Sequence, residues 1–515
     1  MRAAPTFEDC PLLEDPKGRI AVSEAKALAK NILIFSDGTG QIGGIRPDQK
    51  LSNVYKLYRA LRPGPASFID PRQQVAFYDP GLGTGEVSGW TFKRTKQFLE
   101  ATVGTGIDTN IIDCYEAIIA AYEVGDRICL FGFSRGAYTV RALASVLNLC
   151  GVPIRLPDGR PMPKYGAALR DVAYEAVQKV YNHGAGKRRN AQPYFDQREE
   201  LGRRFRLRYE SSQNGEPAAP RGNVEPHFIG VFDTVAALGS SSLKSIFGAI
   251  LLSAGLLTAA SFAFQFHWIF KLLSIASVSL TLGWLLYLAA ILRKSYSPVC
   301  KELEIDLRKV PNKNLSKRST NWAFWHNKNY DRFLSGEVAY ARHAMAIDEE
   351  RASFPRVEWG PKVTPARRAD QKPRWLKQVW FAGCHSDIGG SYTESESRLS
   401  DIALAWMVEE LRDCVPEILI NDRELQTFGD HRGLQHEERY MVKALGWQWK
   451  IRPRYVFEDG ELHDSVYRRI DAGLVPIVDE VKTYRPKQLR LHTKLRAIFE
   501  QEVIEDKRPD EAPIK

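Results

Sequence analysis

The sequence predicts an α/β fold in which a mainly parallel β-sheet is flanked by helices. Apolar segments short enough to be strands alternate along the chain with segments whose apolar residues have helical spacing, which is the pattern of α/β proteins. The predicted strands are apolar throughout rather than at alternate positions, as at 127–133 (RICLFGF). That pattern is typical of parallel strands covered on both faces. At 515 residues, the chain is long enough for one large domain with additions.

The predicted elements follow one another in a regular order. Strands and helices alternate in the first third of the chain, with strands at 31–35, 75–78 and 127–133 and helices at 51–61, 107–122 and 137–149. After a long interruption the sheet is expected to resume with strands at 227–235 and 377–381. An amphipathic helix is predicted at 400–411.

Shifts in composition divide the chain further. The first residues contain acids and prolines and lack the apolar core of a cleavable signal peptide. We expect a lead-in at 1–29, an α/β domain at 30–239 and 296–430 containing a Pro-, Arg- and Gly-rich cap or insertion at 152–222, an inserted apolar hairpin at 240–295, and a charged C-terminal extension at 431–515.

The charge and the cysteines limit the partners. A formal net charge of +10 favours anionic partners, but the basic residues are spread out, so we expect a solvated basic surface and no nucleic-acid partner. Seven cysteines without a C-x-x-C pair are predicted to be reduced thiols. No zinc-binding pattern is present. Asp37, Asp233 and Asp387 could surround a divalent ion, but their spacing demands none, and no metal is predicted.

Two apolar runs indicate a membrane segment. Residues 246–264 and 272–292 contain no charge over 19 and 21 residues, and a helix of about 20 such residues spans a bilayer. Lys244, Arg293 and Lys294 flank the pair, which orients both ends toward the cytoplasm. The sequence therefore predicts a two-helix transmembrane hairpin in an integral membrane protein, with the globular part and both termini cytoplasmic. A hairpin that dips into one leaflet and a buried core hairpin are the alternatives.

The strongest motif is Gly132-Phe133-Ser134-Arg135-Gly136. An apolar strand is predicted directly before it and a helix directly after it, which is the context of a nucleophile elbow. The glycines permit a tight turn that holds the serine hydroxyl at the sheet edge. The N–H of Arg135, at the helix start, then points at a developing oxyanion. The sequence thus predicts an α/β-hydrolase-like fold with Ser134 as its nucleophile.

A nucleophilic serine needs a base, and the base needs an orienting acid. In this fold the chain order is serine, acid, histidine. Asp233 lies at the end of the predicted strand 227–235, and His385 follows the strand 377–381. Both are expected at the carboxyl ends of strands, where active sites of open α/β folds lie. The predicted triad is Ser134, Asp233 and His385. Weaker candidates are Asp387, Asp348 and Asp401 for the acid and His343 and His463 for the base.

A second oxyanion donor is expected from the loop after the first strand. That loop is SDGTG at 36–40, so Gly38 or Thr39 would offer a backbone N–H beside that of Arg135. The glycines at 38, 40 and 43 also match the dinucleotide fingerprint. Pro47 opposes the helix that the fingerprint requires, however, and no cofactor is predicted.

Several separated motifs resemble a known family. NILIFSDGTG, GFSRGAYTVRALA, GVFDTVAALG and VWFAGCHSDIGGSY are similar to the uncharacterised α/β-hydrolase domain family related to type VI secretion phospholipase effectors. The resemblance spans about 30 to 410. It implies that the elbow serine, the Asp of F-D-T-V and the His of H-S-D-x-G-G are catalytic, which are Ser134, Asp233 and His385. It also implies a phospholipid substrate. The apolar hairpin departs from the family and argues for a resident membrane enzyme.

These features predict a membrane-anchored serine hydrolase that cleaves carboxylic esters, as a lipase or phospholipase, by acyl transfer to Ser134 without a cofactor. The expected partners are a lipid or ester substrate and a membrane, because a hairpin beside Asp233 would hold the site near the bilayer and a basic face favours anionic headgroups. Two alternatives stay open. One is an esterase or thioesterase for soluble substrates, and the other is a non-catalytic membrane interaction module on a hydrolase fold.

Overall fold

The computed structural model describes most of the chain between residues 29 and 505. The described residues are 29–38, 50–65, 67–81, 106–184, 187–216, 219–235, 268–294, 334–352, 354–357, 368–442 and 447–505, together with isolated positions between them. The predicted lead-in at 1–29 lies almost entirely outside the described residues.

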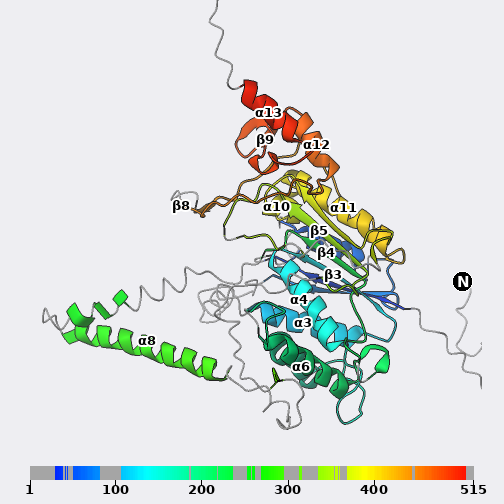
Figure 1. Cartoon of the computed structure of the whole chain (residues 1–515), viewed down its shortest axis with the longest axis vertical. Coiled ribbons are helices and arrows are strands. Elements are labelled where there is room, and N and C mark those ends of the chain that lie inside the picture. Colours follow the sequence, from blue (N-terminus) through cyan, green and yellow to red (C-terminus); the bar gives the residue numbers. More distant parts are fainter. Residues whose placement is uncertain are drawn as a thin grey trace, which may run out of the picture.

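A six-stranded sheet forms the centre of the fold (Figure 1), and each neighbouring pair of its strands is parallel. The strand order is β2-β1-β3-β4-β5-β6, with β1 (Asn31–Ser36), β2 (Gln74–Asp79), β3 (Arg127–Phe133), β4 (Phe228–Phe232), β5 (Tyr340–Ala346) and β6 (Leu376–Phe381). The prediction of an α/β fold with a mainly parallel sheet is confirmed.

Strand β5 is absent from the predicted strands. Arg342 and His343 interrupt its apolar pattern, although both are fully buried. The guanidinium of Arg342 is compensated by Glu410, at 2.5 Å. A buried, paired charge therefore occupies a strand position that the sequence pattern assigns to apolar residues.

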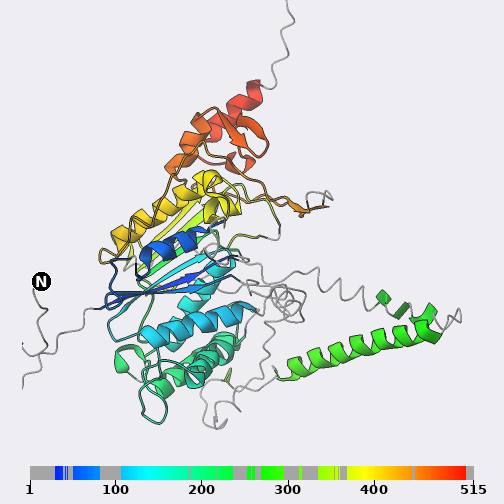
Figure 2. The same ribbon diagram turned by 180° about the vertical axis from the view of Figure 1, so that it is seen from behind.

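Helices cover both faces of the sheet (Figure 2). Alternate residues of β1 point to opposite faces: Ile32 and Ile34 join one hydrophobic core, whereas Leu33 and Phe35 join another. The helices that supply these cores are α3 (Gly106–Ala121) and α4 (Arg135–Cys150) on one face, and α1 (Asn53–Leu61) and α11 (Arg398–Cys414) on the other. Both faces are covered, as the continuously apolar strands predict.

The predicted insertion at 152–222 adds an outer layer of helices. It contains α5 (Ala167–Tyr174), a π-helical turn (Glu175–Tyr181) and α6 (Tyr194–Tyr209). Leu169 and Phe205 extend the core of α3 and α4, and α5 contacts α3 while α6 contacts α4. Figure 2 shows this layer on the side of α3 and α4 that faces away from the sheet.

The C-terminal extension, predicted to be charged and irregular, packs on the edge of the sheet. The N–H of Trp380 in β6 donates to the carbonyl of Glu461 at 2.9 Å, and its carbonyl accepts from the N–H of His463 at 2.9 Å. A third core joins Trp380 and Met345 to the extension. The edge of β6 is thereby covered. The extension contains β7 (Tyr440–Val442), β8 (Trp447–Gln448), α12 (Asp464–Asp471), β9 (Leu474–Ile477), β10 (Glu480–Thr483) and α13 (Arg496–Glu505).

The predicted membrane hairpin at 240–295 is wrong. In the part of the chain that the structure describes, no helix combines enough length with enough apolar character to cross a bilayer. A spanning hairpin needs two such helices, and most of the first apolar run lies outside the described residues. The second run forms α8 (Trp268–Lys294), which lies away from the sheet (Figure 1). The predicted integral membrane localisation, with both termini cytoplasmic, falls with the hairpin.

Candidate active site

Ser134 occupies a strained turn between β3 and α4. Its backbone has φ 57° and ψ −118°, a conformation that residues other than glycine rarely adopt. Two glycines make room for the turn: a Cβ on Gly132 would lie 2.5 Å from the carbonyl oxygen of Gly136, and one on Gly136 would lie 2.6 Å from that of Asp37. The serine is 6% exposed. This geometry is that of a nucleophile elbow.

Replacing Gly136 by alanine is expected to distort the elbow. The new Cβ would overlap the carbonyl group of Ser36, which belongs to a buried strand and has little room to move. We expect the free energy of unfolding to fall by about 3 kcal/mol or more, as measured by urea denaturation. Gly64→Ala is the control, since a Cβ there meets no atom within 4 Å. Equal denaturation midpoints for the two variants would contradict the close packing of the elbow.

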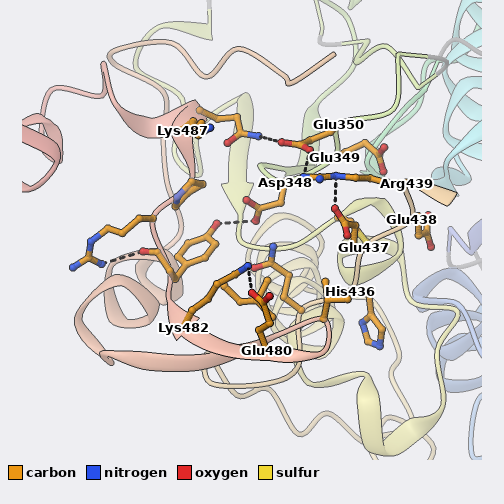
Figure 3. Close-up of a pocket in the computed structure, with 18 of the residues that line it drawn as sticks. Asp348, Glu349, Glu350, His436, Glu437, Glu438, Arg439, Glu480, Lys482 and Lys487 are labelled. Carbon is orange, nitrogen blue, oxygen red and sulfur yellow. Dashed lines mark hydrogen bonds and ion pairs between the residues drawn. The ribbon is translucent and has the colours of Figure 1, made fainter. Parts of the chain in front are cut away.

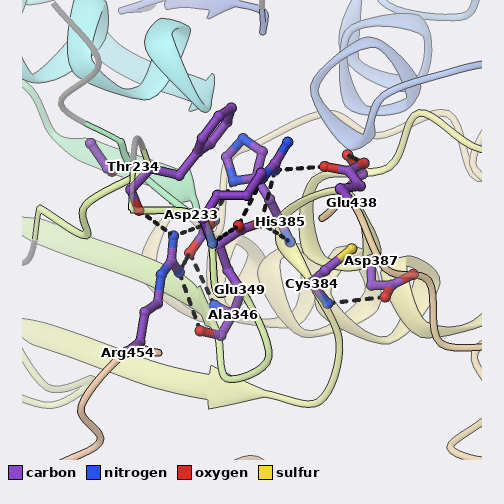
Figure 4. Close-up of polar contacts among 12 residues, drawn as sticks. Asp233, Thr234, Ala346, Glu349, Cys384, His385, Asp387, Glu438 and Arg454 are labelled. Atoms are coloured by element: carbon purple, nitrogen blue, oxygen red, sulfur yellow. Dashed lines mark hydrogen bonds and ion pairs between the residues drawn. The ribbon is translucent and has the colours of Figure 1, made fainter. Parts of the chain in front are cut away.

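The structure brings Asp233 and His385 together (Figure 4). Asp233 follows β4 with a φ of 36°, and His385 begins the short helix α10 (His385–Gly389) after β6. Nδ1 of His385 lies 2.5 Å from Oδ2 of Asp233, and both residues are buried. The imidazole also contacts the rings of Phe133 and Phe354, at centroid distances of 4.7 and 5.2 Å. These contacts orient Nδ1 of His385 toward the carboxylate of Asp233.

Asp233 is held as a carboxylate by several donors. Arg454, from the C-terminal extension, donates from Nη1 to Oδ1 at 2.5 Å and from Nη2 to Oδ2 at 2.9 Å. The N–H of Ala346 donates to Oδ1 at 3.0 Å. Burial by itself raises the pKa of Asp233, but the charge of Arg454 and the bond to His385 outweigh it and hold this pKa well below its usual range. No local motif marks Arg454 in the sequence, because its partner is 221 positions away.

Ser134 and His385 belong to the same edge of the sheet, at the carboxyl ends of β3 and β6. The N–H of Ser134 donates to the carbonyl of Phe232, the last residue of β4, at 3.1 Å. Phe133 packs between this turn and α10, where a Cβ on Gly389 would overlap its ring. Among the described residues, no hydrogen bond joins the Ser134 hydroxyl to His385; in hydrolases this bond often tightens only in the substrate complex.

The alternative acids have other partners. Asp387 accepts from Nδ1 of His436 at 2.7 Å. Asp348 accepts from the hydroxyl of Tyr484 at 2.8 Å, and burial raises the pKa of Asp348 to about 7. Asp401 forms an ion pair of 2.9 Å with a lysine of α1. None of the three therefore has the contact with His385 that Asp233 has.

The alternative bases are also engaged elsewhere. Nε2 of His343, in β5, accepts from the backbone N–H of Thr234 at 3.3 Å. Burial, together with the charge of Arg141, lowers the pKa of His343 to about 3. His463 caps α12 and accepts from the N–H of Ser465 at 3.2 Å. Within the described part of the chain, neither imidazole has the hydrogen bond to a carboxylate that orients a general base.

Two of the three predicted oxyanion donors, Arg135 and Gly38, belong to the described residues. Arg135 is the first residue of α4, so its backbone N–H belongs to the helix N-terminus. Gly38 adjoins the serine, since a Cβ on Gly38 would lie 3.5 Å from the Cβ of Ser134. The N–H of Gly38 donates to Oδ1 of Asp37 at 2.7 Å, so it serves an oxyanion only after leaving that carboxylate. Thr39 lies outside the described residues.

The three aspartates considered as metal ligands lie in separate networks. Asp37 accepts from the hydroxyls of Ser52 at 2.5 Å and Tyr78 at 2.7 Å, and burial raises the pKa of Asp37 to about 6. Asp233 and Asp387 have the partners given above. Within the described ranges, no group of three or more His, Cys, Asp or Glu side chains is arranged to hold a metal ion.

A charged cleft of about 520 Å³ lies where the C-terminal extension meets the α/β domain (Figure 3). Its wall nearest the candidate site contains Glu349, whose carboxylate accepts from the N–H of His385 at 3.3 Å. Arg351 links Glu349 to Glu438, at 2.8 and 2.6 Å. This wall of the cleft therefore carries paired charges, whereas Ser134, Asp233 and His385 themselves are not among the residues that line the cleft.

Comparison with known proteins decides the family. The family model described as "T6SS, Phospholipase effector Tle1-like, catalytic domain" matches residues 30–270 and 306–410. The chain belongs to this family. The matched part of this Tle1-like domain contains the whole six-stranded sheet together with Ser134, Asp233 and His385, whereas Arg454 lies beyond it. The description of the family names a phospholipase effector.

Two individual proteins match the chain over only part of their own length. The uncharacterized protein YEL023C of Saccharomyces cerevisiae is 31% identical over 137 residues, which are 25% of this chain and 19% of the yeast protein. A crystal structure of an uncharacterized protein from Pseudomonas aeruginosa is 16% identical, with a TM-score of 0.32, over 79% of this chain and 50% of that chain. The chain thus spans about a fifth of the yeast protein and half of the solved one.

Proposed function

We propose that this Tle1-like domain is a serine hydrolase that cleaves carboxylic ester bonds of lipids. Ser134 is the nucleophile, His385 the general base and Asp233 the acid that orients the base. The observation that carries the proposal is the 2.5 Å hydrogen bond between Asp233 and His385, at the sheet edge where Ser134 occupies an elbow turn. Family membership supports lipid as the substrate class.

Acylation is the first half of the proposed reaction. The Ser134 hydroxyl attacks the carbonyl carbon of the ester, and its proton passes to Nε2 of His385. Asp233 stabilises the imidazolium through Nδ1. The carbonyl oxygen becomes an oxyanion, which the N–H of Arg135 and a second donor from the Gly38 loop stabilise. The tetrahedral intermediate then expels the alcohol, which takes the proton from His385 and leaves an acyl group on the serine.

Deacylation reverses these roles. A water molecule loses a proton to His385 and attacks the acyl carbonyl carbon, and the second tetrahedral intermediate collapses. Ser134 leaves with the proton from His385, and the fatty acid is released. Each residue returns to its starting state, so the cycle consumes only ester and water.

A substrate panel tests this proposal. Purified full-length protein should react with a fluorophosphonate probe, and it should hydrolyse phospholipid in mixed micelles at least tenfold faster than p-nitrophenyl butyrate. Protein pre-treated with the probe is the control and should hydrolyse neither. A preference for the soluble ester would replace lipid by a soluble substrate. Absence of both labelling and hydrolysis would leave a non-catalytic module on a hydrolase fold.

A further inference from the structure

The carboxylate of Asp233 has a partner that the proposed mechanism does not use. The guanidinium of Arg454 meets it edge to edge, with the two bonds of 2.5 and 2.9 Å, and the two side chains are 5% and 1% exposed. We propose that Arg454 is a positioning residue of the catalytic centre, which holds Asp233 ionised and correctly oriented for His385. The C-terminal extension therefore completes the centre. This inference rests on the proposed function of Ser134, His385 and Asp233.

A short stretch of backbone pairing positions Arg454 beside Asp233. Residues 450–452 run antiparallel to 350–352, with hydrogen bonds of 2.8 and 2.6 Å. The guanidinium then also donates to the carbonyl oxygens of Ala346, at the end of β5, and Phe354, each at 3.2 Å. Phe354 is the residue whose ring contacts the catalytic imidazole. Arg454 therefore contacts both Asp233 and the end of β5 (Figure 4). Through Phe354 it also contacts a residue that packs on the base.

The planar fork of arginine suits this task better than a point charge. Two parallel N–H···O bonds fix the plane of a carboxylate as well as its position. The positive charge also offsets the buried negative charge of Asp233. Arg454 therefore holds the carboxylate of Asp233 ionised, with its plane set toward Nδ1 of His385.

Two separate effects follow from the loss of Arg454. Misorientation of Asp233 and His385 lowers the reaction rate at every pH. Loss of a positive charge beside the buried carboxylate favours proton uptake at the site, so the acid limb of the pH profile moves to higher pH. The other charged or titratable groups near the pair stay unchanged in this comparison; they are Glu349, Arg351, Glu438, Asp387 and His343.

The test is the rate constant for fluorophosphonate labelling of the full-length protein, measured from pH 5 to 9. For Arg454→Met we expect a plateau rate lower by roughly 10- to 100-fold and an acid limb shifted up by about one pH unit. Arg454→Lys retains the charge but loses the second bond, so we expect a smaller rate loss and an acid limb close to that of the natural protein.

Arg469→Met is the matched control. Arg469 belongs to the same extension and is fully buried, but it donates to the backbone carbonyls of His431 and Gly433 rather than to the triad. We expect this variant to be less stable, with an unshifted acid limb. The proposal is overturned if Arg454→Met labels with the pH profile of the natural protein, or changes rate and profile only as Arg469→Met does.

A double variant tests the proposal if Arg454→Met does not fold. Asp233→Asn with Arg454→Met removes both buried charges, which proteins tolerate better than the loss of one. If Arg454 acts through Asp233, the double variant labels within about threefold of Asp233→Asn alone. A further tenfold loss would assign Arg454 a role independent of the acid. If the natural protein itself is not labelled, the proposed function fails instead, so the two failures are distinguishable.

Discussion

Replacing Ser134 by alanine is expected to abolish both ester hydrolysis and fluorophosphonate labelling. The hydroxyl oxygen is the atom that forms the acyl-enzyme, and no neighbouring group supplies it in the variant. We expect kcat to fall by roughly 10⁶-fold, as in serine hydrolases that lose the nucleophile. The fold should be preserved, because the Ser134 side chain does not cap α4. The measurement is turnover of the lipid ester, with thermal unfolding to verify the fold.

Ser145→Ala is the matched control for this variant. Ser145 lies on the same helix and is nearly as buried, but its hydroxyl accepts from Nη1 of Arg189 at 2.9 Å rather than standing in the elbow. It should hydrolyse and label at normal rates. Retained labelling of Ser134→Ala, with the modified residue found elsewhere by mass spectrometry, would refute Ser134 as nucleophile.

The second large effect is expected for His385→Ala. Without the imidazole, the serine proton has no acceptor and the leaving alcohol no donor, so kcat should fall by roughly 10⁴- to 10⁶-fold. KM should change little, because substrate binding does not depend on proton transfer. The fluorophosphonate labelling rate should fall in parallel, since labelling requires the same activation of Ser134.

The chain contains a closely matched control for His385. His436 also presents Nδ1 to a buried aspartate, Asp387, at 2.7 Å, and its ring stacks on Tyr392 with centroids 3.6 Å apart. His436→Ala should therefore lose a similar histidine–aspartate pair and retain most of the activity. If His436→Ala were the inactive variant and His385→Ala the active one, the general base would have to be reassigned to the second pair.

The sequence predicts the parts of this molecule that depend on local pattern. The elbow is one, because Gly132 and Gly136 relieve clashes within a few residues of Ser134. The strands β1 and β3 are others, since each is apolar and buried on both faces. Asp233 and His385 could be placed at one edge of the sheet because Asp233 lies at the end of one predicted strand and His385 follows another.

The sequence fails where a residue depends on a distant partner. Strand β5 is missed because the charge of Arg342 is compensated by Glu410, which comes 68 positions later. Arg454 is missed for the same reason, with a partner 221 positions away. The hairpin prediction fails for another reason. It is based only on the absence of charged residues from two segments, and composition alone does not determine whether such segments form helices of spanning length.

The covered edge of β6 has a consequence for how the protein is made. A ribosome releases the six strands of the sheet well before residues 461–463, whose backbone pairs with Trp380. Until those residues emerge, the growing chain presents an open strand edge with Met345 and Trp380 of the third core still uncovered, which is the kind of surface that aggregates. The nascent chain therefore passes through an exposed state between the synthesis of β6 and that of residues 461–463. Chaperone dependence should be greatest in that interval and should end when the extension closes the edge.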